Sequence, residues 1–134
     1  MTPIYQTPEK IKLKFEAIKE PDSFWQGKKV LDVGCNEGLL YPLLKDKVKE
    51  CVGIETSIEY LLMAKKNFPE VRFEMVDMRK LNEKFDIIIS LSTFHILDDE
   101  EFEKVVKKYS KLCKVLIMEF PVKGSSSIYH TRNE

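Results

Sequence analysis

Five short runs of β-branched and other apolar residues recur along this chain, separated by stretches with helical spacing. Such alternation is typical of βαβ units, in which helices cross between parallel strands. Several of the runs are apolar on both faces, as expected of strands that helices cover from both sides. The pattern predicts an α/β fold with a doubly wound, mostly parallel sheet of about five strands and helices on both faces. The expected strands are residues 28–33, 49–54, 71–76, 85–91 and 114–120.

The length and composition indicate a single domain. The chain has 134 residues, of which 43% are hydrophobic and 33% charged, and this excludes a disordered or low-complexity chain. We expect an N-terminal helical arm over residues 1–27, a core over 28–120 and a short C-terminal tail over 121–134. No apolar run approaches the ~18–20 residues that span a bilayer, and the N-terminus lacks the apolar segment of a signal peptide. We therefore expect a cytoplasmic protein without membrane contact.

The charged and metal-ligating residues exclude some classes of partner. Lys and Arg number 22 and so do Asp and Glu, so no overall field draws the protein onto nucleic acid. The 3 cysteines are widely spaced and only 2 histidines accompany them, which disfavours a structural zinc site or a disulfide framework. We expect no metal.

The helix ends can also be predicted. Thr7 is a candidate N-cap with Pro8 at the first helical position, as capping preferences favour. In the third helix, Ile58, Leu61 and Leu62 are expected to point inward. Residues 124–127 are expected to form a flexible loop. Candidate N-caps or first residues of the four helices are Thr7, Glu37 or Gly38, Ser57, and Asp98 or Asp99.

The segment from Val30 to Gly38, VLDVGCNEG, is the most informative in the sequence. It combines a strand, a turn that contains Gly34, and an expected helix start at Gly38. Such a turn lets a ligand approach the backbone, and a helix N-terminus offers free N–H groups to an anionic group. A tight turn without any ligand would use the same glycines, so the segment alone leaves both interpretations open.

Acidic and hydroxyl side chains follow the next three strands. Glu55 ends the second expected strand, Asp77 the third, and Ser90 lies at the end of the fourth. In open α/β sheets, ligands bind outside the carboxyl ends of the strands. A carboxylate can accept from both hydroxyls of a ribose, and Asp77 could accept from an exocyclic amine. Each residue alone could be an exposed acid or a cap, but their occurrence at successive strand ends favours a ligand site.

As a set, these segments resemble the class I S-adenosylmethionine-dependent methyltransferases. Residues 30–38 are similar to the family motif VLDVGCGTG, GIETS to the second motif, VDM to the third, and FDIIISLSTFHILDD to the segment around strand four. The resemblance covers residues 28–120 and implies the strand order 3-2-1-4-5. Gly38 is the fifth residue counted from Gly34, whereas a dinucleotide fingerprint has its last glycine at the sixth. Asn36 replaces the usual middle glycine, and asparagine tolerates a positive φ.

The resemblance implies S-adenosyl-L-methionine as the cofactor, with S-adenosyl-L-homocysteine as the product. It assigns Glu55 to the ribose, Asp77 to the adenine amine and Ser90 to the surroundings of the sulfonium. Tyr5 is expected to reach over the site, although a surface tyrosine is an equal alternative. The complete set of implied cofactor-binding residues is Asp32, Gly34, Cys35, Asn36 and Gly38 for the methionine part, with Glu55, Thr56, Asp77, Met78, Ser90 and Tyr5 for the rest.

The chemistry that this cofactor allows is methyl transfer to an acceptor. Orientation of the acceptor supplies much of the rate, because the sulfonium is already activated. His95 is the candidate base for a hydroxyl acceptor, or else a histidine of the site wall. The segment Ser90-Leu-Ser-Thr lacks the Asn/Asp-Pro-Pro-Tyr/Phe signature of many amino and base methyltransferases, which disfavours adenine or glutamine acceptors.

Three functions remain open at this point. The first is a small methyltransferase with an unidentified acceptor, a small molecule being slightly favoured. The second is a cofactor-binding module or subunit that needs a partner to form the substrate site. The third is a protein that binds another adenosine ligand. Because the fifth strand would end the sheet, we expect a dimer or partner chain to pair with its edge, or residues 121–130 to pair across it.

Overall fold

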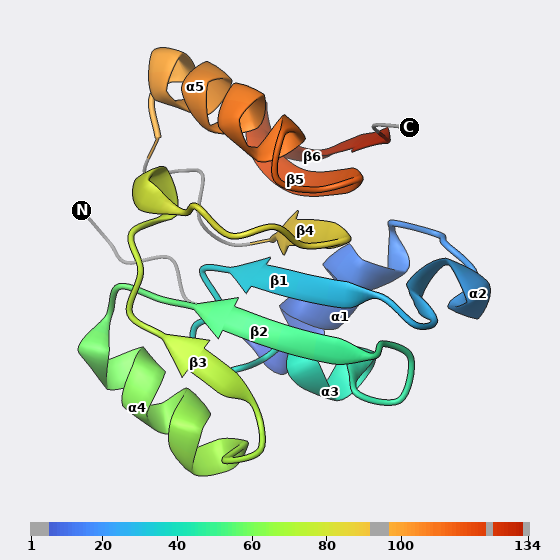
Figure 1. The fold of residues 1–134 in the computed structure, drawn as a ribbon, viewed down its shortest axis with the longest axis vertical. Coiled ribbons are helices and arrows are strands. Elements are labelled where there is room, and N and C mark those ends of the chain that lie inside the picture. Colours follow the sequence, from blue (N-terminus) through green and yellow to red (C-terminus); the bar gives the residue numbers. More distant parts are fainter. Residues whose placement is uncertain (1–5, 92–96, 123–124, 133–134) are drawn as a thin grey trace.

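The computed structural model describes residues 6–91, 97–122 and 125–132. It contains a six-stranded sheet in the order β3-β2-β1-β4-β5-β6 (Figure 1). The first five strands are parallel, and β6 runs antiparallel to β5. The predicted doubly wound α/β sheet and its order 3-2-1-4-5 are therefore confirmed. The strands are β1 (Lys29–Val33), β2 (Glu50–Ile54), β3 (Arg72–Glu74), β4 (Ile87–Ser90), β5 (Val115–Val122) and β6 (Ser125–Arg132).

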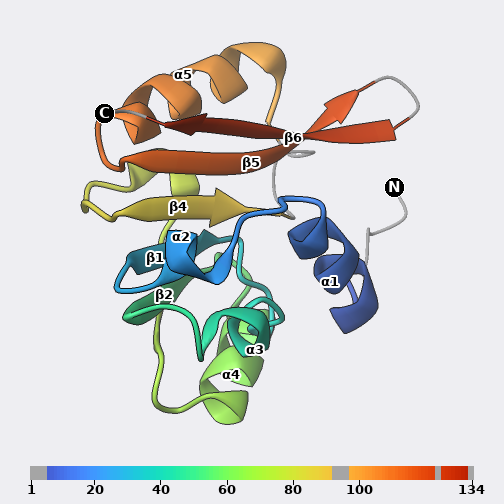
Figure 2. The same cartoon turned by 90° about the vertical axis from the view of Figure 1, so that its right-hand side faces the viewer.

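Helices cover both faces of the sheet (Figures 1 and 2). Helices α1 to α4 contribute to apolar clusters on one face, and α5 packs on the other with Val105 and Tyr109. Because β1 to β4 are parallel, their carboxyl ends meet at one edge of the sheet, where the candidate site lies. The helices are α1 (Pro8–Glu16), α2 (Asp22–Trp25), α3 (Tyr41–Leu44), α4 (Ile58–Asn67), α5 (Asp99–Ser110) and the 3-10 turn η1 (Met78–Lys80).

Three of the predicted helix starts are confirmed by their capping hydrogen bonds. The Thr7 hydroxyl accepts from the Lys10 N–H at 3.2 Å, and the Ser57 hydroxyl from the Tyr60 N–H at 3.4 Å. Asp98 and Glu101 form a reciprocal capping box at the start of α5, with distances of 2.8 and 3.3 Å. These ends were predictable because a cap depends on residues within one turn of each other.

Two helical expectations are wrong. The helix expected from Glu37 or Gly38 begins only at Tyr41, because Gly38 has a φ of 86°, which a right-handed helix cannot contain. Ile58 and Leu62 are exposed, by 52% and 58%, instead of pointing inward. In α4 the inward positions are Leu61 and Ala64, which pack with Cys35 and Phe73. These two positions lie three residues apart and so share one face of the helix.

The C-terminal residues differ from the loop and tail that the sequence predicted. Residues from Ser125 to Arg132 form β6, which pairs with β5 from Val115↔Arg132 to Val122↔Ser125. The alternative that residues after 120 pair across the edge of the fifth strand is thus confirmed. Since β6 occupies this edge of β5, the edge is not open to a partner chain, which corrects that form of the predicted dimer contact.

Within the described ranges, no helix is long and apolar enough to cross a membrane. Cys35, Cys51 and Cys113 are all buried free thiols.

Candidate cofactor-binding site

The turn after β1 is bonded to the end of β2. Gly34 and Asn36 have φ values of 71° and 50°, so the asparagine adopts the left-handed conformation that the sequence predicted it would tolerate. The N–H groups of Gly34 and Cys35 both donate to the carbonyl of Ile54, at 2.9 and 3.1 Å. The Asn36 N–H donates to Oε1 of Glu55 at 2.8 Å. These contacts fix the shape of the turn from a strand that lies 20 residues further along the chain.

The N–H groups of Gly34, Cys35 and Asn36 are not free to bind an anion, since Ile54 and Glu55 accept from them. The N–H of Gly38 donates to the carbonyl of Cys35 at 2.9 Å. The short α3 begins three residues later, at Tyr41, so the helix N-terminus expected at Glu37 or Gly38 does not form there. The turn can therefore contribute to a binding site through its shape and by letting a ligand come close to the backbone.

Gly38 and Cys35 serve packing at this turn. A Cβ on Gly38 would lie 2.9 Å from the Phe68 ring, and its φ is positive, so no other residue fits without strain. Cys35 is 2% exposed and belongs to the apolar cluster beneath α4. Only the backbone of Cys35 can take part in binding at the turn.

Glu55 holds the end of β2 and the β1 turn together. Glu55 is 9% exposed, and its carboxylate accepts three backbone N–H groups. Asn36 donates to Oε1, while Thr56 and Ser57 donate to Oε2 at 2.9 and 3.0 Å. The predicted ligand-binding carboxylate is thus also a structural one.

Asp32 is a buried acid on the neighbouring strand β1. It is 6% exposed, and no donor among the described residues forms a hydrogen bond with its carboxylate. Burial, and secondarily the negative charge of Glu55, raise the pKa of Asp32 to about 8. The side chain is therefore largely protonated at neutral pH, and a nearby cation would favour its ionised form.

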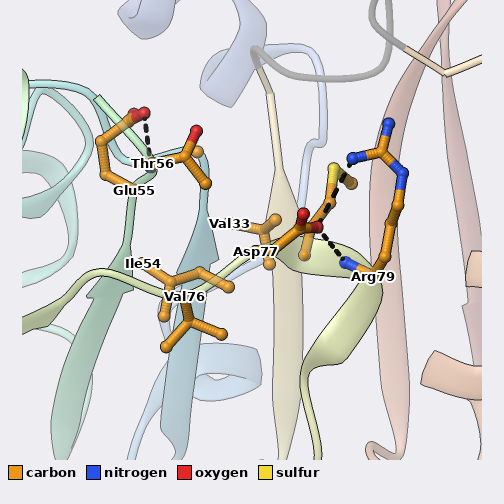
Figure 3. A pocket seen from close by; sticks show the side chains of 9 residues that line it. Val33, Ile54, Glu55, Thr56, Val76, Asp77 and Arg79 are labelled. Carbon is orange, nitrogen blue, oxygen red and sulfur yellow. Dashed lines mark hydrogen bonds and ion pairs between the residues drawn. The ribbon is translucent and has the colours of Figure 1, made fainter.

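A cleft of about 190 Å³ opens at the carboxyl ends of β1, β2 and β3 (Figure 3). Figure 3 shows Ile54 and Val76 between Glu55 at one end and Asp77 at the other. Met78 is 5% exposed, so most of its side chain is packed behind the cleft and only a small part lines it. The cleft combines apolar walls with two carboxylates. Its lining residues are Val33, Gly34, Ile54, Glu55, Thr56, Val76, Asp77, Met78 and Arg79.

Asp77 has a structural role as well as a place in the cleft. Its Oδ1 accepts from the backbone N–H of Arg79 at 2.8 Å and so caps η1. The sequence left open whether Asp77 is a cap or a ligand-binding residue, and the structure shows that it is a cap that also lines the cleft.

Ser90 is fully buried at the end of β4, and its hydroxyl donates to the carbonyl of Val33 at 3.1 Å. It joins the ends of β4 and β1 and does not line the cleft. His95 and Tyr5 lie outside the described residues.

An ion pair joins α1 to β5 beside the end of β4, and it was not predicted from the sequence. The Lys14 ammonium on α1 lies 2.9 Å from Oε2 of Glu119 on β5 and donates to the Leu91 carbonyl at 3.1 Å. The two side chains are only 23% and 11% exposed. They are separated by 105 residues, so no local pattern could have joined them.

Val33, Ile54, Val76 and Arg79 line the cleft and were not among the site residues predicted from the sequence. The first three are the last residues of the predicted strands 28–33, 49–54 and 71–76, so the strand-end rule could have included them. Arg79 carries no such signal. Among the described residues, no group of three or more His, Cys, Asp or Glu side chains is placed to hold a metal ion.

With this geometry, the chain belongs to the class I S-adenosylmethionine-dependent methyltransferase family. A family model described as a methyltransferase domain matches residues 30–115. An uncharacterized methyltransferase of Anoxybacillus flavithermus is 36% identical over 91 residues, which are 66% of this chain and 43% of that protein. The chain thus spans less than half the length of this curated relative.

Solved methyltransferase structures share the fold. Magnesium protoporphyrin IX methyltransferase from Synechocystis, with bound SAM, has a TM-score of 0.74 and 21% identity, covering 88% of this chain and 60% of that one. An S-adenosylmethionine-dependent methyltransferase from Clostridium acetobutylicum has a TM-score of 0.66 and 26% identity, covering 82% and 48%. These likenesses extend across most of the present chain and about half of each relative.

Proposed function

We propose that this protein binds S-adenosyl-L-methionine at the carboxyl ends of β1, β2 and β3 and transfers its methyl group to an acceptor. The observation that carries the proposal is the cleft lined by Glu55 and Asp77, at the strand ends to which the sequence resemblance assigns the cofactor. The cofactor supplies an activated methyl group on its sulfonium. The protein's residues bind it, orient it and exclude water.

The cleft fits the adenosine part of the cofactor. Its volume of about 190 Å³ is below the ~300 Å³ at which sites for whole ligands begin, so it suits one portion of the molecule. The apolar side chains of Ile54, Val76 and Met78 offer contact surface to a purine, with Thr56 at the opposite side. The second oxygen of Asp77 accepts from the exocyclic amine.

The ribose lies beside Glu55 in this proposal. A carboxylate has about four acceptor directions, and backbone amides use three of them here. One direction on Oε1 is left, so Glu55 accepts from a single ribose hydroxyl and not from both. This is a narrower role than the sequence suggested.

The methionine part lies toward Asp32 and the turn from Gly34 to Gly38. Asp32 is buried and has a raised pKa, so it can ionise when an ammonium group arrives. Asn36 and Cys35 contribute through the shape of their backbone. Binding at this end should therefore release a proton from Asp32 near neutral pH.

The acceptor lies beyond β4 in this proposal, near Ser90 and Leu91. His95 is proposed as the base for a hydroxyl acceptor and Tyr5 as a cover over the sulfonium, both from the sequence resemblance. A small molecule is the proposed acceptor. A cytoplasmic location is part of the proposal, and the three buried free thiols support it because reducing compartments keep thiols unpaired.

A cofactor-binding subunit is the second candidate function. The buried pair of Lys14 and Glu119 fills the carboxyl ends of β4 and β5, where an acceptor would have to approach. On this alternative the chain binds the cofactor but needs a second chain to complete the acceptor site. Turnover by the isolated chain distinguishes the two.

Calorimetric titration with S-adenosylmethionine, S-adenosylhomocysteine and ATP tests the proposal. We expect binding of the first two ligands and none of ATP. Replacing Glu55 with alanine should weaken binding by ~1–3 kcal/mol or more, because the charge-assisted hydrogen bond to the ribose is lost together with the three bonds that hold the turn. Preference for ATP would favour a different adenosine ligand, and unchanged affinity in Glu55→Ala would remove Glu55 from the site.

A further inference from the structure

Arg79 stands between the cleft and helix α5, and no step of the proposed function uses it. It lines the cleft next to Asp77 and Met78. Its Nη1 lies 3.5 Å from Oδ1 of Asp77, and its Nε donates to Oε2 of Glu101 at 2.8 Å. One guanidinium therefore contacts a carboxylate of the cleft and a carboxylate of α5 at the same time.

The two oxygens of Asp77 are not equivalent. Oδ1 receives both the backbone N–H and the guanidinium of Arg79, as the dashed lines of Figure 3 show. Oδ2 has no hydrogen-bond partner among the described residues. With Oδ1 held by two donors from one residue, rotation of the carboxylate would break both contacts, so Oδ2 stays available to a ligand.

Arg79 is itself held from α5. The Oε1 atom of Glu101 accepts from the Asp98 N–H in the capping box, so Glu101 is fixed while Oε2 binds Arg79. Lys108 donates to the carbonyl of Arg79 at 2.9 Å. The hydroxyl of the buried Tyr109 donates to the carbonyl of Met78 at 2.6 Å. The wall of the cleft over η1 is thus attached to α5 at three points.

We propose that Arg79 is a positioning residue for adenine recognition: it holds Oδ1 of Asp77 and thereby presents Oδ2 to the exocyclic amine. The proposal rests on the proposed function, since it assumes that an adenosine ligand occupies the cleft. Arginine suits this task because its planar guanidinium can donate to two carboxylates in a fixed geometry, which a lysine ammonium cannot reproduce. Selectivity for adenine over a purine without the amine is the property that Arg79 controls.

The test compares two probes, S-adenosylhomocysteine and its analogue with purine in place of adenine, which lacks only the amine. Calorimetry gives the ratio of their dissociation constants for each variant. We expect the unmodified protein to prefer S-adenosylhomocysteine by about tenfold, the worth of one good hydrogen bond to a charged group. Arg79→Ala should reduce this ratio to about threefold or less while the affinity for the analogue changes less than about twofold.

Arg72→Ala is the matched control. Arg72 is 42% exposed against 41% for Arg79, and it also pairs with a glutamate at 2.8 Å, but it lies outside the cleft. It should keep the tenfold ratio. Arg79→Lys should behave like Arg79→Ala. If Arg79→Ala does not fold, Glu101→Gln is used instead, because glutamine also completes a capping box but holds the guanidinium less strongly, and the ratio should again fall.

The outcomes separate the two proposals. If the unmodified protein binds neither probe, the proposed function fails and this inference with it. If it binds both equally, Asp77 does not read the amine and the role of Arg79 is overturned while cofactor binding stands. If the tenfold preference is present and survives Arg79→Ala, or is lost equally in Arg72→Ala, Arg79 has no specific positioning role.

Discussion

Replacing Glu55 with glutamine should destabilise the fold even without any ligand. The change keeps the length of the side chain and exchanges one carboxylate oxygen for an amide NH₂. The remaining oxygen can still accept from Thr56 and Ser57, as Oε2 does now at 2.9 and 3.0 Å. The new NH₂ then faces the N–H of Asn36, which now donates to Oε1 at 2.8 Å, so two donors meet and that bond is lost.

The magnitude follows from the three bonds. A hydrogen bond to a charged group contributes ~1.5–3 kcal/mol and a neutral one ~0.5–1.5 kcal/mol. One charged bond is lost and two become neutral. The removal of a buried charge next to Asp32 offsets part of this cost, since Glu55 raises the pKa of that acid. We expect a net loss of about 2–4 kcal/mol in the free energy of unfolding.

Urea unfolding followed by circular dichroism measures this loss. With a slope of about 2 kcal/mol per molar urea, a loss of about 2–4 kcal/mol should lower the midpoint by ~1–2 M. Glu74→Gln is the control, because Glu74 is 48% exposed and only pairs with Arg72 at 3.4 Å. It should change stability by less than ~0.5 kcal/mol. A Glu55→Gln protein within that same margin of the original would show that the turn does not depend on the carboxylate.

Three further variants test other parts of the molecule. The folded pKa of Asp32, about 8, exceeds the ~3.9 of the unfolded chain, so stability should fall as pH rises from about 4 to 8, by at most ~1.4 kcal/mol per unit. Asp32→Asn should remove this dependence, as urea midpoints at pH 5 to 8 would show, whereas an identical slope in the variant would contradict the assignment. Asn36→Gly should keep the turn, since φ is 50° there, and bind S-adenosylhomocysteine as well or better in titration; a clear loss of affinity in a folded variant would mean that the Asn36 side chain binds the ligand. Tyr109→Phe should cost ~1–2 kcal/mol in thermal or urea unfolding by leaving the Met78 carbonyl unpaired, and no measurable loss would show that this bond is dispensable.

The features that the sequence predicted are those encoded within a few residues. The strands around Leu31, Val52 and Ile88 were predictable because runs apolar on both faces indicate a sheet covered on both sides. The positions of Glu55 and Asp77 followed from the same strands, since the carboxyl ends of parallel strands meet at one edge. The sequence therefore predicted the position of the cleft at the strand ends, although it did not predict all of the residues that line it.

The features that the sequence did not predict depend on distant contacts. The segment after Gly34 forms a turn instead of a helix, since Gly38 has a φ of 86°, and Ile54 and Glu55 accept the N–H groups of this turn. Arg79 is oriented by Glu101, which is 22 residues away in the sequence. No periodicity in the intervening residues records such a pairing.

Strand β6 is a further element that its local sequence does not predict. Its sequence SSSIYHTR has no regular apolar alternation and follows a glycine, so locally it favours a loop. It forms a strand beside β5, whose backbone donors and acceptors would otherwise lack partners along that edge. Its conformation is thus set by a neighbouring strand more than by its own residues.

The three buried cysteines allow local opening of the fold to be measured separately in three regions. Cys35 lies in the β1 turn, Cys51 in β2 and Cys113 just before β5, and burial raises the pKa of each thiol, that of Cys113 to about 11. Only a thiolate reacts with common labels, so each sulfur reacts when its surroundings open. Labelling rates in native buffer would thus report three separate local openings without any introduced probe. A ligand bound at the turn would slow the labelling of Cys35 but not that of Cys51 or Cys113. The three labelling rates would thus show which region the ligand stabilises.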